Sequence, residues 1–252
     1  MTGAALLAAR AALRLGGGRV YVGLIDAHSL PLDPQQPELM LRTPQALRDS
    51  ELTVLACGPG LGTSDQAKAL LADALTREIP LVLDADALNL VAAEGDLHVA
   101  LATRRLPTLL TPHPAEAARL LGSDVATIQA DRIAAALELA ERFNAWVALK
   151  GCGTIVTSPD GRWRINATGN PGLATAGSGD VLTGMIAALI AQGWAAEAAL
   201  MAAVHLHGAA ADRLVAAGIG PIGLTAGELI DAARHALNHW IANTAPQNPV
   251  RP

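Results

Sequence analysis

The sequence alternates short apolar runs with longer stretches of helical periodicity, and this alternation constrains the fold more than any other feature. The apolar runs lie at 19–24, 52–58, 80–85, 107–112 and 145–151. The helical patterns lie at 4–14, 65–78, 115–122, 127–143, 180–192 and 195–216. Strands that are apolar on both faces and are separated by helices are typical of a parallel sheet covered on both sides. The sequence therefore predicts an α/β fold of three layers, α-β-α, with a mostly parallel central sheet.

The pattern changes after residue 150. Segments 154–158 and 162–166 are short, and they flank the turn sequence Pro-Asp-Gly at 159–161. This arrangement predicts an antiparallel hairpin. We expect one domain over 1–243, followed by a disordered tail over 244–252 that is rich in proline and polar residues.

Composition limits the classes of partner. Apolar residues make up 51% and charged residues 16% of the chain, which suits one globular domain with a sizeable core. A net charge of −5 and an aromatic content of 2% argue against nucleic acid as a partner. The longest apolar run, 181–196, is interrupted by polar residues and is too short to span a membrane. Two isolated cysteines fit a reducing compartment, so we expect a cytoplasmic protein with no membrane partner.

Polar and glycine-rich segments lie at one predicted edge of the sheet. Ligands of parallel sheets bind beyond the carboxyl ends of the strands. The segments at that edge therefore outline one candidate site, and they lie at 58–62, 84–89, 111–116, 150–154 and 169–185.

The segment 169–185, GNPGLATAGSGDVLTGM, leads directly into an apolar helical pattern. Gly177, Ser178 and Gly179 carry little side-chain bulk, so their amides and those of the first helical turn can converge on a phosphate. Asp180 could then take a proton from a hydroxyl that reacts with that phosphate. The alternative is that Asp180 only caps the helix. Because a cap does not need the preceding glycines, we favour the catalytic role.

The same segment resembles the signature of the ADP-dependent NAD(P)H-hydrate dehydratases, a family of the ribokinase-like superfamily. Further motifs follow in the order of that family: GPGLGTS, VLDADALNL, LLTPHPAEAARLLG, LKGCGTIV and GLTAGELI. The sequence GSGD alone marks only the superfamily, whereas TPHPAE together with KGCGT is specific. The resemblance implies a ribokinase-like fold over nearly the whole chain.

The resemblance also implies an activity, the repair of NADH or NADPH whose nicotinamide ring has been hydrated. The hydroxyl of the hydrate is phosphorylated by ADP (by ATP in some members) with Mg²⁺, and phosphate is then eliminated. Asp180 is the implied catalytic residue, and the implied substrate contacts are Ala4, Gly60, His113 and Asp180. The implied nucleotide contacts are Lys150, Gly151, Cys152, Gly153, Thr154, Gly177, Ser178 and Gly179.

Several polar residues at this edge have simpler interpretations. A single histidine such as His113 is usually a surface or core residue, and no second His or Cys lies at a ligand spacing, so we expect no metal held by the protein. Lys150 would neutralise a phosphate or merely end a strand. Glu116 could hold Mg²⁺ through water, but it also suits the first turn of a helix, which we favour. Asp86 suits a helix N-cap. The role of Asp84 stays open.

The chain departs from the family at its front. Members usually begin with a strand and a glycine-rich turn before the segment that corresponds to 1–4, and this opening is absent here. We expect the missing strand to expose a sheet edge and to remove one wall of the substrate site. A fragment, a late start or a fusion to the family's partner epimerase would each produce such a front.

Two other functions fit part of the pattern. A kinase of a small alcohol, such as a vitamin precursor, would use the same phosphate site and the same Asp180. A truncated relative would bind nucleotide without turning it over. The apolar, alanine-rich helices are compatible with a homo-oligomer, which we expect.

Overall fold

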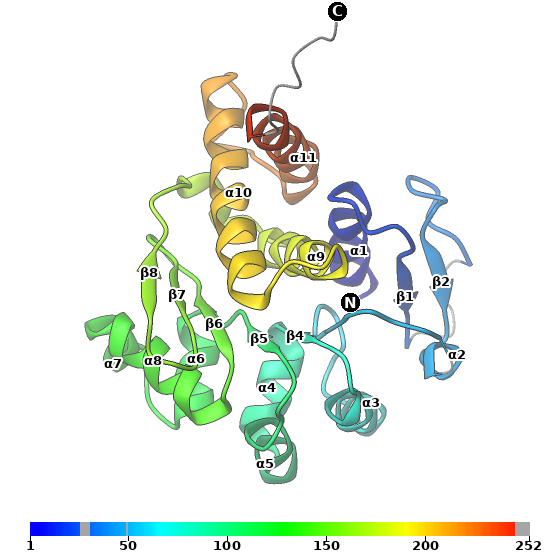
Figure 1. The fold of residues 1–252 in the computed structure, drawn as a ribbon, viewed down its shortest axis with the longest axis vertical. Helices are drawn as coiled ribbons and strands as arrows, with labels where there is room; N and C mark the ends of the chain where they lie inside the picture. The colour runs from blue at the N-terminus through cyan, green and yellow to red at the C-terminus, as the bar shows by residue number, and fades with distance from the viewer. Residues whose placement is uncertain (26–30, 49, 245–252) are drawn as a thin grey trace, which may run out of the picture.

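A six-stranded sheet forms the centre of the computed structural model, which describes residues 1–25, 31–48 and 50–244 (Figure 1). Neighbouring strands of this sheet follow one another along the chain: β3 (Leu55–Cys57), β4 (Leu81–Leu83), β5 (Thr108–Leu110), β6 (Trp146–Leu149), β7 (Ile155–Thr157) and β8 (Trp163–Ile165). The strands from β3 to β6 are parallel, and β7 and β8 add an antiparallel hairpin. The predicted α/β fold with its mostly parallel sheet is therefore confirmed.

Helices cover both faces of this sheet, because its strands are apolar on both sides. Along β4, Val82 packs into one core cluster, whereas Leu81 and Leu83 pack into another. The cluster around Val82 is formed with α1 (Thr2–Arg14), α9 (Ser178–Ala191), α10 (Ala196–Ala216) and α11 (Ala226–Thr244). The opposite cluster is formed with α3 (Asp65–Thr76), α4 (Ala85–Ala93), α5 (Gly95–Ala102), α6 (Pro114–Leu121), α7 (Val125–Ala130) and α8 (Arg132–Phe143). Figure 1 shows the two helical layers on either side of the strands.

The helix expected over 127–143 is divided in two. Asp131 leaves helical geometry, with φ −145° and ψ 84°, between α7 and α8. Its side chain accepts a hydrogen bond from the amide of Ala134 at 2.9 Å and so caps α8. An aspartate prefers this capping position to the interior of a helix, which explains why an unbroken apolar pattern does not give an unbroken helix.

The first two strands form a separate sheet. β1 (Tyr21–Gly23) pairs in parallel with β2 (Met40–Arg42), which leads into the short helix α2 (Pro44–Arg48). Within the described residues, β1 pairs only with β2, and β3 pairs only with β4. A mainly apolar cavity of about 640 Å³ lies between β1 and β3 and extends to α1 and α9. In this part of the described molecule, β1 and β3 therefore each have one edge without a partner strand.

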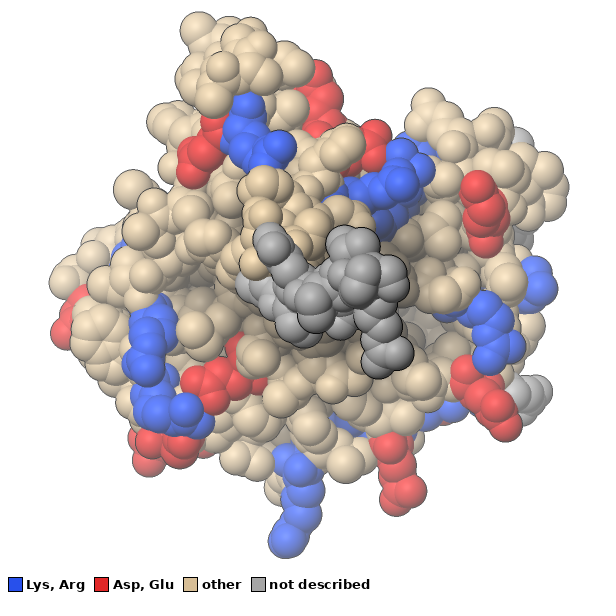
Figure 2. Space-filling model, turned by 45° about the horizontal axis from the view of Figure 1, so that its top comes forward, with Lys and Arg blue, Asp and Glu red and all other residues tan. Residues whose placement is uncertain are grey.

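The C-terminal tail, the surface charges and the hydropathy of the helices complete the description of the fold. The predicted disordered tail, apart from Thr244, lies outside the described residues. Side chains of both charge signs are intermingled on the face shown in Figure 2. No helix of the described ranges has the length and hydropathy to cross a membrane.

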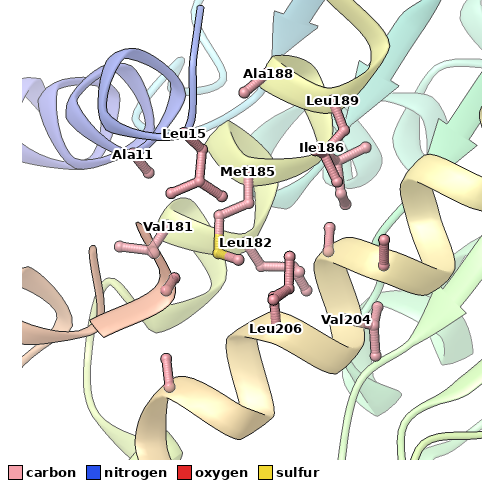
Figure 3. Close-up of a cluster of buried hydrophobic side chains, with 14 of the residues drawn as sticks. Ala11, Leu15, Val181, Leu182, Met185, Ile186, Ala188, Leu189, Val204 and Leu206 are labelled. Carbon is pink, nitrogen blue, oxygen red and sulfur yellow. The ribbon is translucent and has the colours of Figure 1, made fainter. Parts of the chain in front are cut away.

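α9 is the central helix of the upper layer, and it approaches α1 very closely. Val181, Met185 and Leu189 of α9 belong to one buried cluster with Leu15 near the end of α1 and Leu206 of α10 (Figure 3). A Cβ atom added to Gly184 of α9 would lie 1.9 Å from the carbonyl oxygen of Ala8 in α1. The two helices can therefore pack in this way only while residue 184 is a glycine.

We predict that Gly184→Ala lowers the free energy of unfolding by about 3 kcal/mol, because α1 must move away from α9. Gly227→Ala is the matched control: this exposed glycine in the first turn of α11 has no atom within 4 Å of its added Cβ. The control should gain about 0.4–1 kcal/mol by reducing unfolded-state entropy. Urea unfolding of both variants tests this, and equal effects would contradict the close approach of the helices.

Candidate active site

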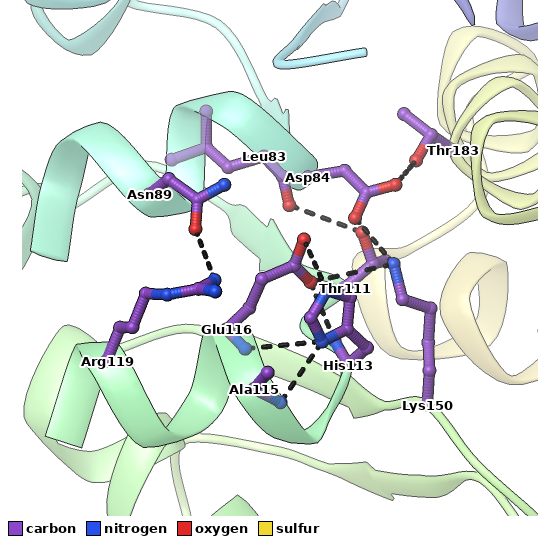
Figure 4. A network of polar contacts seen from close by, with 10 residues as sticks. All are labelled: Leu83, Asp84, Asn89, Thr111, His113, Ala115, Glu116, Arg119, Lys150 and Thr183. Atoms are coloured by element: carbon purple, nitrogen blue, oxygen red, sulfur yellow. Dashed lines mark hydrogen bonds and ion pairs between the residues drawn. The ribbon is translucent and has the colours of Figure 1, made fainter. Parts of the chain in front are cut away.

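The carboxyl ends of β4, β5 and β6 meet the N-terminus of α9 at one edge of the sheet. Asp84 follows β4, His113 lies between β5 and α6, and Lys150 follows β6. These three side chains belong to one polar network, shown in Figure 4, which also includes Glu116 and Thr183. The segments that the sequence placed at a common edge are therefore brought together.

Lys150 lies at the centre of the network. Its Nζ is 2.7 Å from Oδ1 of Asp84 and 3.9 Å from Oε2 of Glu116. Burial would by itself lower the pKa of Lys150, but the two carboxylates outweigh burial and raise it. The Lys150 ammonium is therefore charged at any physiological pH, and it counteracts the burial that raises the pKa of Glu116.

Asp84 connects this lysine to α9. Its second oxygen, Oδ2, accepts a hydrogen bond of 2.7 Å from the hydroxyl of Thr183. Asp84 is 1% exposed, and Thr183 is fully buried. The carboxylate therefore has one partner from the end of β6 and one from α9, and it fixes both elements relative to β4.

The first turn of α9 has the features of an anion site. Gly177 precedes the helix with a φ of +86°, and no side chain caps this end. Within the described residues, the amides of Gly179 and Asp180 have no hydrogen-bond partner. A Cβ atom added to Gly179 would lie 3.2 Å from Nζ of Lys150. An ammonium group and a helix N-terminus therefore meet at one place, and both attract a phosphate.

Asp180 lies beside this anion site. Burial, and after it the charge of the Asp84 carboxylate, raise its pKa to about 6, although Lys150 opposes the shift. The Asp180 carboxyl therefore changes its charge close to neutral pH. A carboxylate with this pKa is a better proton acceptor than an ordinary aspartate and still exists in ionised form at pH 7.

His113 is fixed by the start of α6. Its Nδ1 accepts hydrogen bonds from the amides of Ala115 and Glu116, at 3.1 and 3.3 Å, while Oε2 of Glu116 accepts from the His113 amide at 2.7 Å. The simpler interpretation of Glu116 as a first-turn residue is thus confirmed. Burial and then the charge of Lys150 lower the pKa of His113, so the ring is neutral and carries its proton on Nε2. Its side chain is 47% exposed and can reach a ligand.

An arginine to which the sequence assigned no role fixes the conformation of the loop 150–154. Arg132, the first residue of α8, donates to the carbonyl oxygens of Cys152 at 2.7 Å and Leu149 at 3.0 Å. Gly151 and Gly153 have φ values of +148° and +65°, which favour glycine. Thr154 closes the loop through a hydrogen bond from its hydroxyl to the Gly151 carbonyl, at 3.3 Å.

The loop 58–62 contacts the start of the chain. The Met1 ammonium donates to the Gly60 carbonyl at 2.7 Å, and the Met1 carbonyl accepts from the Ala4 amide at 3.2 Å. The prediction that Asp86 caps a helix is wrong, because α4 begins at Ala85 and Asp86 instead accepts from the Gly62 amide at 2.7 Å. The Asp86 carboxylate thus binds the loop 58–62 to the first turn of α4.

Helix α10 supports the segment before α9. Asp212 accepts from the Gly169 amide at 2.8 Å and from the Asn170 side chain at 2.9 Å. The Ser178 hydroxyl lies 3.2 Å from Nε2 of buried His207, whose pKa is lowered to about 4 by burial. No sequence motif marks these partners, because they are distant in the chain.

Comparison with known proteins supplies the family context. The sequence profile described as NAD(P)H-hydrate dehydratase matches residues 1–234. An ADP-dependent (S)-NAD(P)H-hydrate dehydratase from Neisseria meningitidis is 46% identical over 250 residues, covering 96% of this chain and 81% of the relative. A bifunctional NAD(P)H-hydrate repair enzyme from Coxiella burnetii is 40% identical over 94% of this chain, which spans only 48% of that longer relative.

Solved structures give the same picture. The ADP/ATP-dependent NAD(P)H-hydrate dehydratase from Bacillus subtilis, co-crystallised with ATP and Mg²⁺, has a TM-score of 0.79 and 31% identity over 95% of this chain and 86% of its own. The adenosine kinase from Sinorhizobium meliloti has a TM-score of 0.61 over 92% of this chain and 82% of its own. At 16% identity, this second likeness shows the fold alone.

The raised pKa of Asp180 predicts how this residue affects stability. Its carboxyl titrates near pH 6 in the folded protein but has an ordinary value of 3.8. Folding therefore favours the protonated form, and the ionised form destabilises the protein increasingly between about pH 4 and pH 6, and constantly above.

We therefore predict that Asp180→Asn raises the free energy of unfolding at pH 7.5 more than it does at pH 4. Urea unfolding at the two pH values measures this. An equal effect at both would contradict the raised pKa. Asp65→Asn, at an exposed position in the first turn of α3, is the control that removes a carboxylate from outside the site.

Proposed function

The chain belongs to the NAD(P)H-hydrate dehydratase family, and we propose that it restores NADH and NADPH from their hydrates at the site around Asp180. The observation that carries this assignment of the site is the position of Asp180 in the first turn of α9. Its carboxyl has a pKa of about 6 and lies next to amides that have no partner among the described residues. A base and an anion site are thus adjacent.

The reaction uses both features. The hydroxyl oxygen of the hydrate attacks the terminal phosphorus of the nucleotide, and Asp180 accepts the hydroxyl proton. The bond from that phosphorus to the next phosphate breaks, so ADP yields AMP and the hydrate becomes a phosphate ester. The ester then loses phosphate together with a proton from the neighbouring carbon, and the ring double bond re-forms. The sum is one water removed and one phosphate bond cleaved.

The remaining residues bind and orient the reactants. The segment 177–179 and the start of α9, with the amides of Gly179 and Asp180 that are unpaired within the described residues, hold the transferred phosphoryl group, and Lys150 neutralises its charge. The open loop from Lys150 to Thr154 binds the adenine nucleotide, including backbone contacts at Gly151, Cys152 and Gly153. The neutral ring of His113 contacts the hydrated nicotinamide nucleotide, as do Gly60 and Ala4.

The nucleotide also brings the metal. The described residues include no group of three His, Cys, Asp or Glu side chains that could hold an ion. Mg²⁺ binds nucleotide phosphates well with few protein ligands. We therefore propose that it arrives on ADP or ATP, where it supplies charge neutralisation. The relative from Neisseria meningitidis supports ADP as the donor, and the protein from Bacillus subtilis supports both nucleotides.

A small-alcohol kinase would need the same base and anion site. The family match and the 46% identity to a dehydratase favour dehydration over that alternative. The two differ in product: the kinase would release a stable phosphate ester. We further propose a cytoplasmic homo-oligomer that works with an epimerase for the hydrate, either as a separate protein or fused, as the name of the bifunctional relatives suggests.

Asp180→Asn should lower kcat by about 1,000-fold, because the amide cannot accept the hydroxyl proton. The assay mixes NADH hydrate, Mg²⁺ and ADP (or ATP) and follows the return of the near-ultraviolet absorbance of the reduced nicotinamide. Binding of ADP, measured by calorimetry, should persist. In the native protein kcat/KM should rise with pH through about 6, as Asp180 ionises. Full activity of the variant would overturn the assignment of the base.

Arg132→Ala should weaken ADP binding about tenfold, because the loop 150–154 loses two hydrogen bonds from a charged group. Arg142→Ala is the matched control, since this arginine lies in the last turn of the same helix and pairs with Glu138 at 2.6 Å. Calorimetric titration with ADP compares the two variants. Equal affinity for ADP would show that the loop does not depend on Arg132.

A further inference from the structure

Asp84 occupies an unusual position for a buried carboxylate. It is the residue before α4, where aspartate commonly caps a helix, but its side chain makes no capping hydrogen bond. The next residue, Ala85, has a φ of +49°, a conformation that costs a non-glycine residue free energy. This backbone turn goes together with a side chain that contacts Lys150 and Thr183 instead of α4. The local sequence thus forgoes a helix cap in favour of two distant partners.

Those partners account for both oxygens of Asp84. Oδ1 contacts Nζ of Lys150 and Oδ2 accepts from Thr183, each at 2.7 Å. Thr183 lies one helical turn after Asp180 on α9. A buried ion pair adds little net free energy to folding, because the desolvation of both charges offsets their attraction. A role in holding the site gives a better reason for this pair.

The Asp180 carboxylate also lies within the electrostatic range of Lys150. The pKa of Asp180 responds to the charges of Lys150 and Asp84, and to those of Asp86 on α4 and the Met1 ammonium. Glu116 is 3.9 Å from the ammonium, and the charges of His113 and buried His207 respond to it as well. Without Asp84, Lys150 would be drawn to Asp180 and Glu116. An ion pair with Asp180 would neutralise the base that the reaction requires.

We propose that Asp84 is a positioning residue, which holds the Lys150 ammonium under the first turn of α9 and keeps it from pairing with Asp180. This inference rests on the proposed function of the same site. Asp84 contacts neither reactant in this arrangement. It acts through Lys150, which stays available to the transferred phosphoryl group. It also acts through Thr183, which fixes the position of α9 relative to Lys150.

Asp84→Asn tests the proposal, because asparagine keeps the size and the hydrogen bond from Thr183 but removes the charge. We expect kcat to fall on the order of 100-fold, with less than about a threefold change in the KM for ADP. The apparent pKa in the pH profile of kcat/KM should move below 6, because Lys150 then pairs with Asp180 and the Asp84 charge is gone. Asp65→Asn, at the exposed start of α3, is the charge control and should change neither quantity.

The position of α9 is tested separately, with a second pair of variants that keeps the Asp84 charge. Thr183→Val removes the hydrogen bond to Asp84 and should lower kcat about tenfold, whereas Thr183→Ser keeps the hydroxyl and should retain activity. Equal rates for the Val and Ser variants would overturn the role of Thr183 as an anchor for Asp84. If Asp84→Asn does not fold, this pair decides the proposal.

A direct titration separates failure of this inference from failure of the proposed function. Carbon-13 NMR of the Asp180 carboxyl, in the protein without substrate, should give a lower pKa in Asp84→Asn than in the native chain. This shift is expected even if the native chain does not dehydrate NADH hydrate. An unchanged Asp180 titration, or a loss of kcat with an unchanged pH profile, would reduce Asp84 to a structural role and overturn the proposal.

Discussion

The buried ion pair between Lys150 and Asp84 holds together the elements on which the site depends. A lysine at the end of β6 or an aspartate at the end of β4 would each be strongly unfavourable in this place alone, because a buried charge needs a partner. Their contact at 2.7 Å therefore requires β4, β5 and β6 to be aligned at their carboxyl ends. The hydrogen bond from Thr183 adds α9 to the same arrangement.

Helix α9 can present its first turn to a ligand because the rest of it is fixed by packing. Every residue from Val181 to Ile190 is buried between α1, α10, α11 and the sheet. Glycines make this packing possible: Gly184 admits the backbone of α1, and Gly179 admits the Lys150 ammonium beneath the first turn. The amides of that turn are thus held in fixed positions, and the phosphate that we propose for this site would need little reorganisation to bind.

Much of this arrangement was predictable from the sequence. The strands β3 to β6 lie inside the predicted apolar runs, and the hairpin β7–β8 lies around the predicted turn. The segment before Asp180 forms a helix N-terminus with amides available to a ligand, as its glycines predicted. These features depend on short-range preferences, and the family motifs strengthened them. The comparisons confirm the family, whereas the roles of individual residues are our proposals.

The partners that the sequence did not reveal lie far apart along the chain. Asp84, Lys150 and Thr183 are separated by dozens of residues, and Arg132 reaches a loop that begins well after it. A pattern of neighbouring residues contains no information about such partners, and for this reason Asp86 was wrongly expected to cap a helix. The sequence by itself determined the strand and helix order and the glycine-rich approach to Asp180, since backbone preferences and apolar periodicity are local. Only the tertiary structure decided which charges meet, because an ion pair forms where folding brings two side chains out of water together.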